Sequence, residues 1–196
     1  MQHMDLVIVN YGAGNIQSIR FAFQRLGHSL ELSADPDRIR RADKVIFPGV
    51  GEASSAMTKL TESGLDKVIP ELHQPVLGIC LGMQLMCHSS EEGPTKGLGI
   101  FDADVLRFPG DLKVPQIGWN SIHKLGPPVF MGLDEGAYIY LVHSYYAPLC
   151  RDTIATTDYG FPYSAALARD NFYGVQFHPE KSSAPGARIL ENFLKL

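Results

Sequence analysis

The sequence has few cysteines, a single tryptophan and no long hydrophobic run. Three of its 196 residues are cysteines, Cys80, Cys87 and Cys150. They are odd in number and lack the spacing of a disulfide framework or a zinc site. This scarcity argues against a secreted, disulfide-stabilised fold and favours a protein of the reducing cytoplasm. We expect no bound metal and no cofactor.

The chain also has only a small excess of charge of one sign. The formal net charge is −4, and lysine and arginine are scattered along the chain. This balance gives no electrostatic reason to expect nucleic acid or an anionic membrane as a partner. The apolar run near the N-terminus is too short to span a bilayer, and no basic segment precedes it. We therefore expect neither export nor membrane insertion.

Short aliphatic runs alternate with helical patterns in the first half of the chain. Strands are predicted at 6–10, 29–32, 44–51 and 75–80. Apolar residues recur at helical spacing in the segments 16–26, 53–72 (broken near 63–64) and 81–90. Strands that are each followed by a helix indicate a parallel sheet covered on both faces.

The second half of the chain has a different pattern, with strands joined by short connections. Strands are predicted at 105–108, 138–142, 154–157, 165–168 and 173–177, before a C-terminal helix from about 185 to 194. No linker, repeat or low-complexity segment interrupts the pattern. We expect one α/β domain over residues 1–196, with a mostly parallel, mixed central sheet flanked by helices.

A cysteine stands between two glycines in "PVLGICLGMQLM", where a predicted strand gives way to a helix. The Gly-x-Cys-x-Gly pattern around Cys80 is similar to a nucleophile elbow, in which small neighbours accommodate a strained backbone. We expect the side chain of Cys80 to be lifted out of the fold. The alternative is a buried cysteine beside glycines that only permit close packing, and the pentapeptide alone weighs about equally for both.

A cysteine nucleophile needs a base, and one histidine is placed to serve as one. His178 ends the apolar strand "YGVQF", and Glu180 follows two residues later, on the same face of an extended backbone. A salt-bridged pair at a strand end is the alternative. Five other histidines lie in polar or terminal settings and are expected at the solvated surface: His3, His28, His73, His88 and His123.

Together, the Cys80 elbow and the His178–Glu180 pair resemble the two signatures of class I, triad-type glutamine amidotransferases, "GICLGMQLM" and "GVQFHPEKS". The resemblance implies a flavodoxin-like three-layer sandwich and a catalytic triad of Cys80, His178 and Glu180. It also implies that glutamine is hydrolysed to glutamate and ammonia. The thiolate would attack the amide, and His178 would move the protons.

Further motifs along the chain resemble one branch of this family. "NYGAGNIQSI", "PGVG", "SEEG", "VPQIGWNSI" and "VHSYY" occur in order before "GVQFHPEKS". They are similar to the glutaminase subunit of imidazole glycerol phosphate synthase, an enzyme of histidine biosynthesis, over essentially the whole chain. The resemblance places the oxyanion hole at Gly49, Val50 and Leu81. It assigns glutamine binding to Gly51, Gln84, Glu92, His143, Ser144 and Tyr145.

The resemblance also implies a partner, a (β/α)₈-barrel cyclase subunit that forms a heterodimer and consumes the ammonia to make imidazole glycerol phosphate and AICAR. The candidate interface residues are Asn15, Trp119, Asn120 and Lys181, since an isolated tryptophan in a Gly-Trp-Asn turn is difficult to place in a core. A half-buried packing role is the alternative for Trp119. Two positions depart from the family pattern. Asn10 stands for aspartate and Gln116 for histidine, and we expect both at or near the partner-facing surface.

Three other functions fit parts of the pattern. The glutaminase subunit of pyridoxal phosphate synthase has a similar size and triad, but "GWN" and "FHPEKS" disfavour it. A cysteine peptidase or esterase leaves Gln84 and the "HSY" segment without a purpose. A non-catalytic regulatory module would commonly have lost a member of the triad, and all three members are present here.

Overall fold

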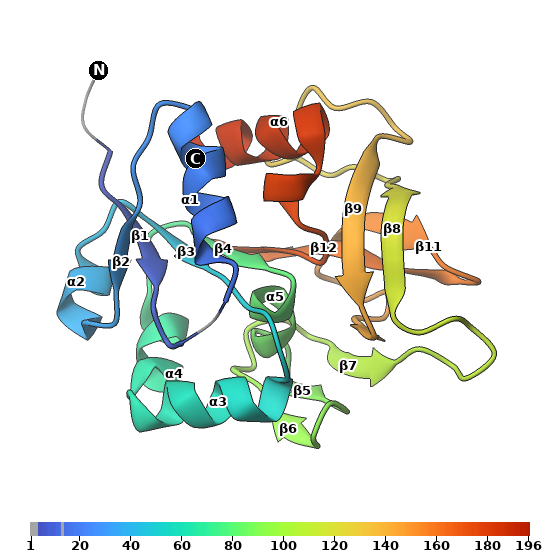
Figure 1. The fold of residues 1–196 in the computed structure, drawn as a ribbon, viewed down its shortest axis with the longest axis horizontal. Coiled ribbons are helices and arrows are strands. Elements are labelled where there is room, and N and C mark those ends of the chain that lie inside the picture. The colour runs from blue at the N-terminus through green and yellow to red at the C-terminus, as the bar shows by residue number, and fades with distance from the viewer. Residues whose placement is uncertain (1–3, 13) are drawn as a thin grey trace.

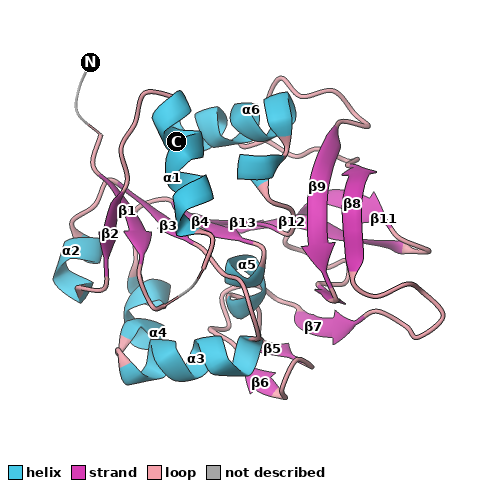
Figure 2. Cartoon of the chain, viewed as in Figure 1, coloured by secondary structure: helices cyan, strands magenta, loops and turns pink. Residues whose placement is uncertain are grey.

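A seven-stranded sheet forms the centre of the molecule in the computed structural model, which describes residues 4–12 and 14–196 (Figure 1; Figure 2). His3 lies outside the described residues. In spatial order the strands are β11 (Thr153–Asp158), β12 (Pro162–Arg169), β13 (Phe172–Val175), β4 (Val76–Ile79), β3 (Lys44–Phe47), β1 (Leu6–Val9) and β2 (Glu31–Ser33). The strands from β13 to β2 run parallel, whereas β12 pairs antiparallel with both β13 and β11. The predicted mixed, mostly parallel sheet is confirmed.

Helices cover both faces of this sheet because its strands are apolar on both sides. In β1, Val7 and Val9 point into one core cluster, whereas Leu6 and Ile8 point into the other. The first cluster is closed by α3 (Ala53–Glu62), α4 (Leu65–Val68) and α5 (Leu81–Leu85). The second is closed by α1 (Ile16–Arg25) and α6 (Ser183–Leu194), on the opposite side of the sheet in Figure 1. The result is a three-layer α/β sandwich.

Smaller strands extend the carboxyl half of the molecule. One small sheet has the order β10 (Tyr145–Tyr146), β7 (Asp104–Arg107), β5 (Ser89–Ser90), β6 (Thr95–Lys96). A second is the antiparallel pair of β8 (Gln116–Ser121) and β9 (Tyr138–His143). The remaining elements are α2 (Pro36–Arg40) and the 3₁₀ turns η1 (Ile69–Glu71) and η2 (Pro179–Lys181). Strand β8 was not predicted, because a glycine and several polar residues interrupt its apolar pattern.

The helix predicted after β4 is shorter in the structure. The helix expected over 81–90 ends at Leu85, because the following loop turns back and its N–H groups at Leu98 and Ile100 donate to the carbonyls of Leu85 and Met86. The segment 44–51 is a strand that ends in a turn, as expected, because β3 stops at Phe47 before Pro48. The predicted break between α3 and α4 is confirmed at Gly64, whose φ of 72° is readily adopted only by glycine.

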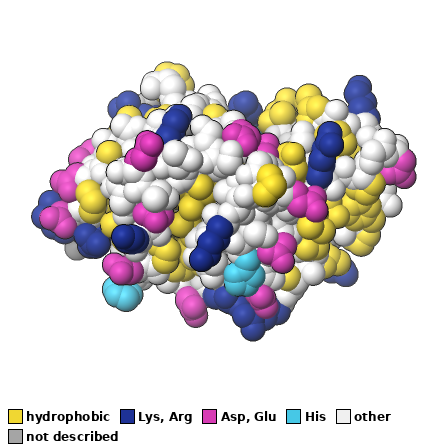
Figure 3. All heavy atoms as spheres, turned by 90° about the horizontal axis from the view of Figure 1, so that it is seen from below, with side chains coloured by type: hydrophobic (Ala, Val, Ile, Leu, Met, Phe, Trp, Pro, Cys, Tyr) yellow, Lys and Arg dark blue, Asp and Glu magenta, His cyan; other side chains and the backbone are white. Residues whose placement is uncertain are grey.

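The surface mixes charges and apolar side chains. Basic and acidic residues are interspersed across the face seen in Figure 3. On the side that carries β8 and β9, Ile117, Trp119 and Tyr138 are each more than half exposed. Among the described residues, none of the helices has both the length and the apolar character needed to cross a membrane.

Candidate active site

Cys80 occupies the single residue between β4 and α5, and its backbone is strained. Its φ of 53° and ψ of −112° lie in a region that residues with side chains rarely adopt. The flanking glycines are required for close packing, since a Cβ on Gly82 would lie 2.0 Å from the carbonyl oxygen of Phe47. The predicted elbow is therefore present. The expectation that Cys80 is lifted out of the fold is wrong, because only 7% of the residue is exposed.

His178 and Glu180 form a buried hydrogen-bonded pair beside this elbow. Nδ1 of His178 lies 2.8 Å from Oε1 of Glu180, whose side chain is fully buried. Extended backbone does not produce this contact, contrary to the sequence-based expectation, because Glu180 lies in the 3₁₀ turn η2. Asn15 donates to the same carboxylate oxygen at 2.6 Å. The amide of Asn15 is therefore tied into the site, and its place at the partner interface stays a prediction.

The environment of His178 favours its charged form. Burial alone would lower the pKa of its imidazole, but the hydrogen bonds and charges of Cys80 and Glu180 outweigh this effect and raise the pKa to about 10. The imidazole of His178 thus stands between the sulfur and the carboxylate and contacts both. A histidine that can hold a proton beside a thiol is the arrangement that nucleophilic catalysis by cysteine needs.

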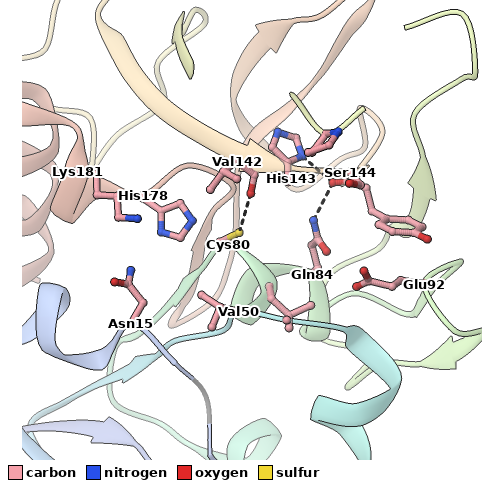
Figure 4. A pocket seen from close by; sticks show the side chains of 14 residues that line it. Asn15, Val50, Cys80, Gln84, Glu92, Val142, His143, Ser144, His178 and Lys181 are labelled. Carbon is pink, nitrogen blue, oxygen red and sulfur yellow. Dashed lines mark hydrogen bonds between the residues drawn. The ribbon is translucent and has the colours of Figure 1, made fainter. Parts of the chain in front are cut away.

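A pocket of about 450 Å³ opens over Cys80 and His178 (Figure 4), a size that suits a small molecule. All six candidate glutamine-binding residues line it: Gly51, Gln84, Glu92, His143, Ser144 and Tyr145. Figure 4 shows Gln84 and Glu92 on one side of the sulfur and His178 on the other. The structure therefore brings together residues that lie far apart in the sequence.

Glu92 and His143 differ in how they meet the pocket. Oε2 of Glu92 accepts from the N–H of Ala53 at 2.9 Å, and burial raises the pKa of this carboxyl. His143 is buried, and burial lowers the pKa of its imidazole to about 4, so that it is neutral at pH 7. Its Nδ1 lies 2.7 Å from the carbonyl oxygen of Tyr145. A neutral imidazole that donates to this carbonyl forms part of the pocket wall and does not compete with His178 as a base.

The loop that carries the expected oxyanion donors presses against the start of α5. A Cβ on Gly49 would lie 2.5 Å from the backbone nitrogen of Gly82, and the hydroxyl of Tyr11 donates to the carbonyl of Pro48 at 2.7 Å. Val50 and Leu81 both line the pocket. Leu81 is the first residue of α5, so its N–H has no partner within the helix.

Comparison with known proteins identifies the family of the chain. A family model described as glutamine amidotransferase class-I matches residues 7–196. The chain is 54% identical to the imidazole glycerol phosphate synthase subunit HisH of Bacteroides fragilis (strain YCH46), covering 98% of this chain and 100% of that protein. It is 48% identical to the HisH subunit of Yersinia pseudotuberculosis, over the same shares of the two chains. The chain belongs to the class I glutamine amidotransferases, among the HisH glutaminase subunits of imidazole glycerol phosphate synthase.

The fold has relatives among solved structures of the same class. The crystal structure of a glutamine amidotransferase from Thermotoga maritima superposes with a TM-score of 0.66, covering 100% of this chain and 84% of that one at 17% identity. The family predicted from the motifs is confirmed. The chain belongs to the HisH subunits, which are part of an enzyme of histidine biosynthesis. This membership disfavours the three alternatives, namely a pyridoxal phosphate synthase subunit, a peptidase or esterase, and a regulatory module.

The candidate interface residues of this HisH-family chain are not equally available to a partner. Trp119 is 53% exposed, and its ring meets Tyr140 edge-on at 6.0 Å. Nζ of Lys181 lies 5.9 Å from the centre of the Tyr140 ring on the same surface. The side-chain amide of Asn120, by contrast, donates to the carbonyl of Asp158 at 2.7 Å within the chain.

The two departures from the family pattern lie in different places. Gln116 is only 4% exposed, so the expectation that it faces a partner is wrong. Its Oε1 lies 2.8 Å from the hydroxyl of Tyr163, which in turn lies 3.1 Å from Nε2 of His143. The alternation along β8 explains this, because Gln116 points inward whereas Ile117 points outward. Asn10 is partly buried and accepts from the N–H of Gly12.

Sequence reasoning overlooked one residue next to the sulfur. Gln176 is fully buried, and its Nε2 lies 3.7 Å from Sγ of Cys80. The signal that could have found it is a polar residue inside the otherwise apolar "YGVQF". Buried amides need hydrogen-bond partners, so such a residue is expected to be tied to a polar site.

Proposed function

We propose that Cys80, His178 and Glu180 hydrolyse the side-chain amide of glutamine. His178 accepts the thiol proton, and the Cys80 thiolate attacks the amide carbon. The same proton then passes from His178 to the departing ammonia, which leaves a glutamyl thioester on Cys80. Water, deprotonated by His178, cleaves the thioester to release glutamate and the free thiol. The observation that carries this proposal is the buried Cys80–His178–Glu180 array at the floor of the pocket.

Glutamine would lie between the triad and the residues on the opposite wall. Glu92 would pair with the α-ammonium group, since its carboxylate lines the pocket. Gln84 would contact the amino-acid end with its free carbonyl oxygen. Gly51 and the segment from His143 to Tyr145 would complete the wall with backbone groups. In this pose the side-chain amide of the substrate extends toward the sulfur.

The tetrahedral intermediate needs two aligned N–H donors, and we propose Leu81 and the Gly49–Val50 region for them. Val50 lies between two glycines, and Gly51 has a φ of 98° and open space around its Cα. A rotation of the Gly49–Val50 peptide, which carries the N–H of Val50, therefore needs no movement of the core. We propose that this loop switches the glutaminase on when the loaded synthase binds.

The ammonia would pass to a (β/α)₈-barrel cyclase subunit, in a heterodimer that makes imidazole glycerol phosphate and AICAR. We propose that the cyclase docks on the surface around Trp119 and Lys181, with Asn15 and Asn120 at its margin. Exposed tryptophan is a frequent anchor of protein interfaces. The three cysteines are free thiols, which suits a cytoplasmic enzyme, and we treat residues 1–196 as one amidotransferase domain.

The test of this function is glutamine turnover by the free chain, by its complex with the cyclase, and by that complex with synthase ligand bound. We expect slow hydrolysis by the free chain and fast hydrolysis by the liganded complex. Cys80→Ser should abolish turnover in every state and leave partner binding intact. Equal rates in all three states would exclude the switch, and retained turnover in Cys80→Ser would exclude the nucleophile.

Docking is tested with a matched pair of apolar variants. Trp119→Ala should weaken binding of the cyclase, whereas Leu32→Ala should not. Leu32 is also exposed, but it lies on β2, at the opposite edge of the central sheet from β11. Equal affinity of both variants and the unmodified chain would move the interface away from Trp119.

A further inference from the structure

Gln176 lies behind the wall of the pocket, between Gln84 and the sulfur of Cys80. It follows β13, and none of its surface is exposed. Its Oε1 accepts from Nε2 of Gln84 at 2.8 Å, and its Nε2 donates to Sγ of Cys80 at 3.7 Å. Gln176 does not line the pocket, so it meets the sulfur from the protein side.

The direction of these hydrogen bonds is determined by a backbone carbonyl. Nε2 of Gln84 lies 2.8 Å from the carbonyl oxygen of Tyr145, which can only accept. The amide of Gln84 must therefore present its nitrogen there, and the same nitrogen faces Gln176. It follows that Gln176 turns its oxygen to Gln84 and its NH₂ group to the sulfur, and a flipped amide would place two donors against each other.

A buried N–H group directed at a sulfur stabilises the thiolate more than the thiol. A thiol is a weak acceptor, whereas a thiolate is a charged one, and hydrogen bonds to charged groups are roughly twice as strong. On the opposite side the thiol can donate to the carbonyl of Val142, 3.9 Å away, and that contact is lost on ionisation. Of these two neighbours, only Gln176 favours the ionised sulfur.

We propose that Gln176 is a catalytic residue that donates a hydrogen bond to the Cys80 sulfur and stabilises its thiolate, with Gln84 as the residue that positions it. The proposal rests on the proposed role of Cys80 as nucleophile. The proton still passes from Cys80 to His178, and Gln176 keeps both of its own amide hydrogens throughout. Its hydrogen bond is strongest before attack on the amide and again when the thiolate is expelled from the thioester.

The geometry separates the effects of the two glutamines on kinetics. Gln84 lines the pocket, so its replacement should raise KM for glutamine and also lower kcat. Gln176 is fully buried and does not line the pocket, so its replacement should lower kcat and leave KM unchanged. We expect a fall in kcat of about tenfold for Gln176→Met, because the difference between a charged and a neutral acceptor is about one pKa unit.

The decisive measurement is the pH dependence of Cys80 alkylation by iodoacetamide, followed by mass spectrometry of the Cys80 peptide in the full chain. Gln176→Met keeps the approximate volume of the side chain and removes the donor. We expect it to raise the midpoint of the alkylation profile by about one pH unit. Asn192→Leu is the matched control, since Asn192 is a buried amide whose donors serve the carbonyls of Val129 and Met131.

The control variant should be less stable than the unmodified chain, but its alkylation profile should be the same as that of the unmodified chain. If folded Gln176→Met also has the alkylation profile of the unmodified chain, the proposal is wrong. If Gln176→Met does not fold, Gln84→Met takes its place, because it leaves the amide of Gln176 without a fixed direction, and an unchanged midpoint there has the same meaning. Failure of the proposed function is separate, since it would appear as glutamine turnover by Cys80→Ser.

Discussion

Replacement of Glu180 by glutamine should damage the enzyme much less than removal of His178. In the structure both nearby donors, Nδ1 of His178 and Nδ2 of Asn15, point at the same oxygen of Glu180. An amide at this position would turn its oxygen toward both donors. The hydrogen bond that orients the imidazole would survive, and only its charge would be lost.

The magnitude follows from the two kinds of hydrogen bond. A hydrogen bond to a charged acceptor contributes about 1.5–3 kcal/mol, and one between neutral groups contributes about 0.5–1.5 kcal/mol. The change therefore reduces the stabilisation of the charged form of His178 by about 1–1.5 kcal/mol. We expect a loss of about tenfold in glutamine turnover for Glu180→Gln. Removal of a general base typically costs about 10²–10⁴-fold, which we expect for His178→Ala.

Glu180→Gln should also lower stability. Among the described residues, Oε2 of Glu180 is buried and has no hydrogen-bond partner. The NH₂ group of the amide would occupy that place without an acceptor, which costs about 1–3 kcal/mol. Urea unfolding of the purified variant measures this cost, and a stability equal to that of the unmodified chain would show that the amide finds another partner.

The assay for catalysis is the pH profile of glutamine hydrolysis by the complex. Glu180 contributes to the raised pKa of His178, so loss of its charge lowers that pKa, and the basic limb of the profile moves to lower pH. In the double variant Asn15→Leu with Glu180→Gln, a donor that directs the new amide at position 180 is removed, and the loss of glutamine turnover should be larger. Equal inactivity of folded Glu180→Gln and His178→Ala would refute this reasoning, as would an unmoved basic limb.

Three further predictions concern other parts of the site. Burial lowers the pKa of His143 to about 4, so the neutral imidazole stabilises the fold above pH 6.5, and this stability is lost as the pH falls through about 4. The loss amounts to up to about 3 kcal/mol in the free energy of unfolding, and in urea unfolding at acid pH His143→Gln should not show it. Gly49→Ala should lower stability by about 1–3 kcal/mol in thermal unfolding, since its Cβ would lie 2.5 Å from a backbone nitrogen of α5, whereas Gly110→Ala, in open space, should not. An electrophilic glutamine analogue should label Cys80 and spare Cys87, whose pKa burial raises strongly, and equal labelling in peptide mass spectra would contradict this.

The sequence was most informative where one local pattern determines both structure and chemistry. The aliphatic strands predicted the central sheet because they are apolar on both faces, as Leu6 and Val7 illustrate. The glycines beside Cys80 predicted the elbow because the strained turn leaves no space for a Cβ. The His178–Glu180 contact was also predicted, although its backbone is a 3₁₀ turn and not extended.

The errors arose where the surroundings of a residue depend on segments far along the chain. Gln116 stands beside "GWN", which was expected to be a turn but belongs to strand β8, and its burial depends on Tyr163, 47 positions later. The hydrogen bond of Asn15 to Glu180 was not foreseen, because the two residues are 165 positions apart. A single sequence without alignment contains the chemical type of such a residue but not the identity of its neighbours, so polar residues were assigned to the surface by default.

The two histidines of the pocket also differ through neighbours that the sequence does not identify. His143 ends β9 and His178 follows β13, yet burial lowers the pKa of the first to about 4 and the neighbouring Cys80 and Glu180 raise that of the second to about 10. Burial disfavours the charged form of both, so the difference comes from their partners. His143 meets a carbonyl and a hydroxyl, which a neutral imidazole satisfies, whereas His178 meets a carboxylate and a thiol. One pocket thus holds a neutral wall and a cationic acid, and it is the anionic partners of His178 that suit it to move protons.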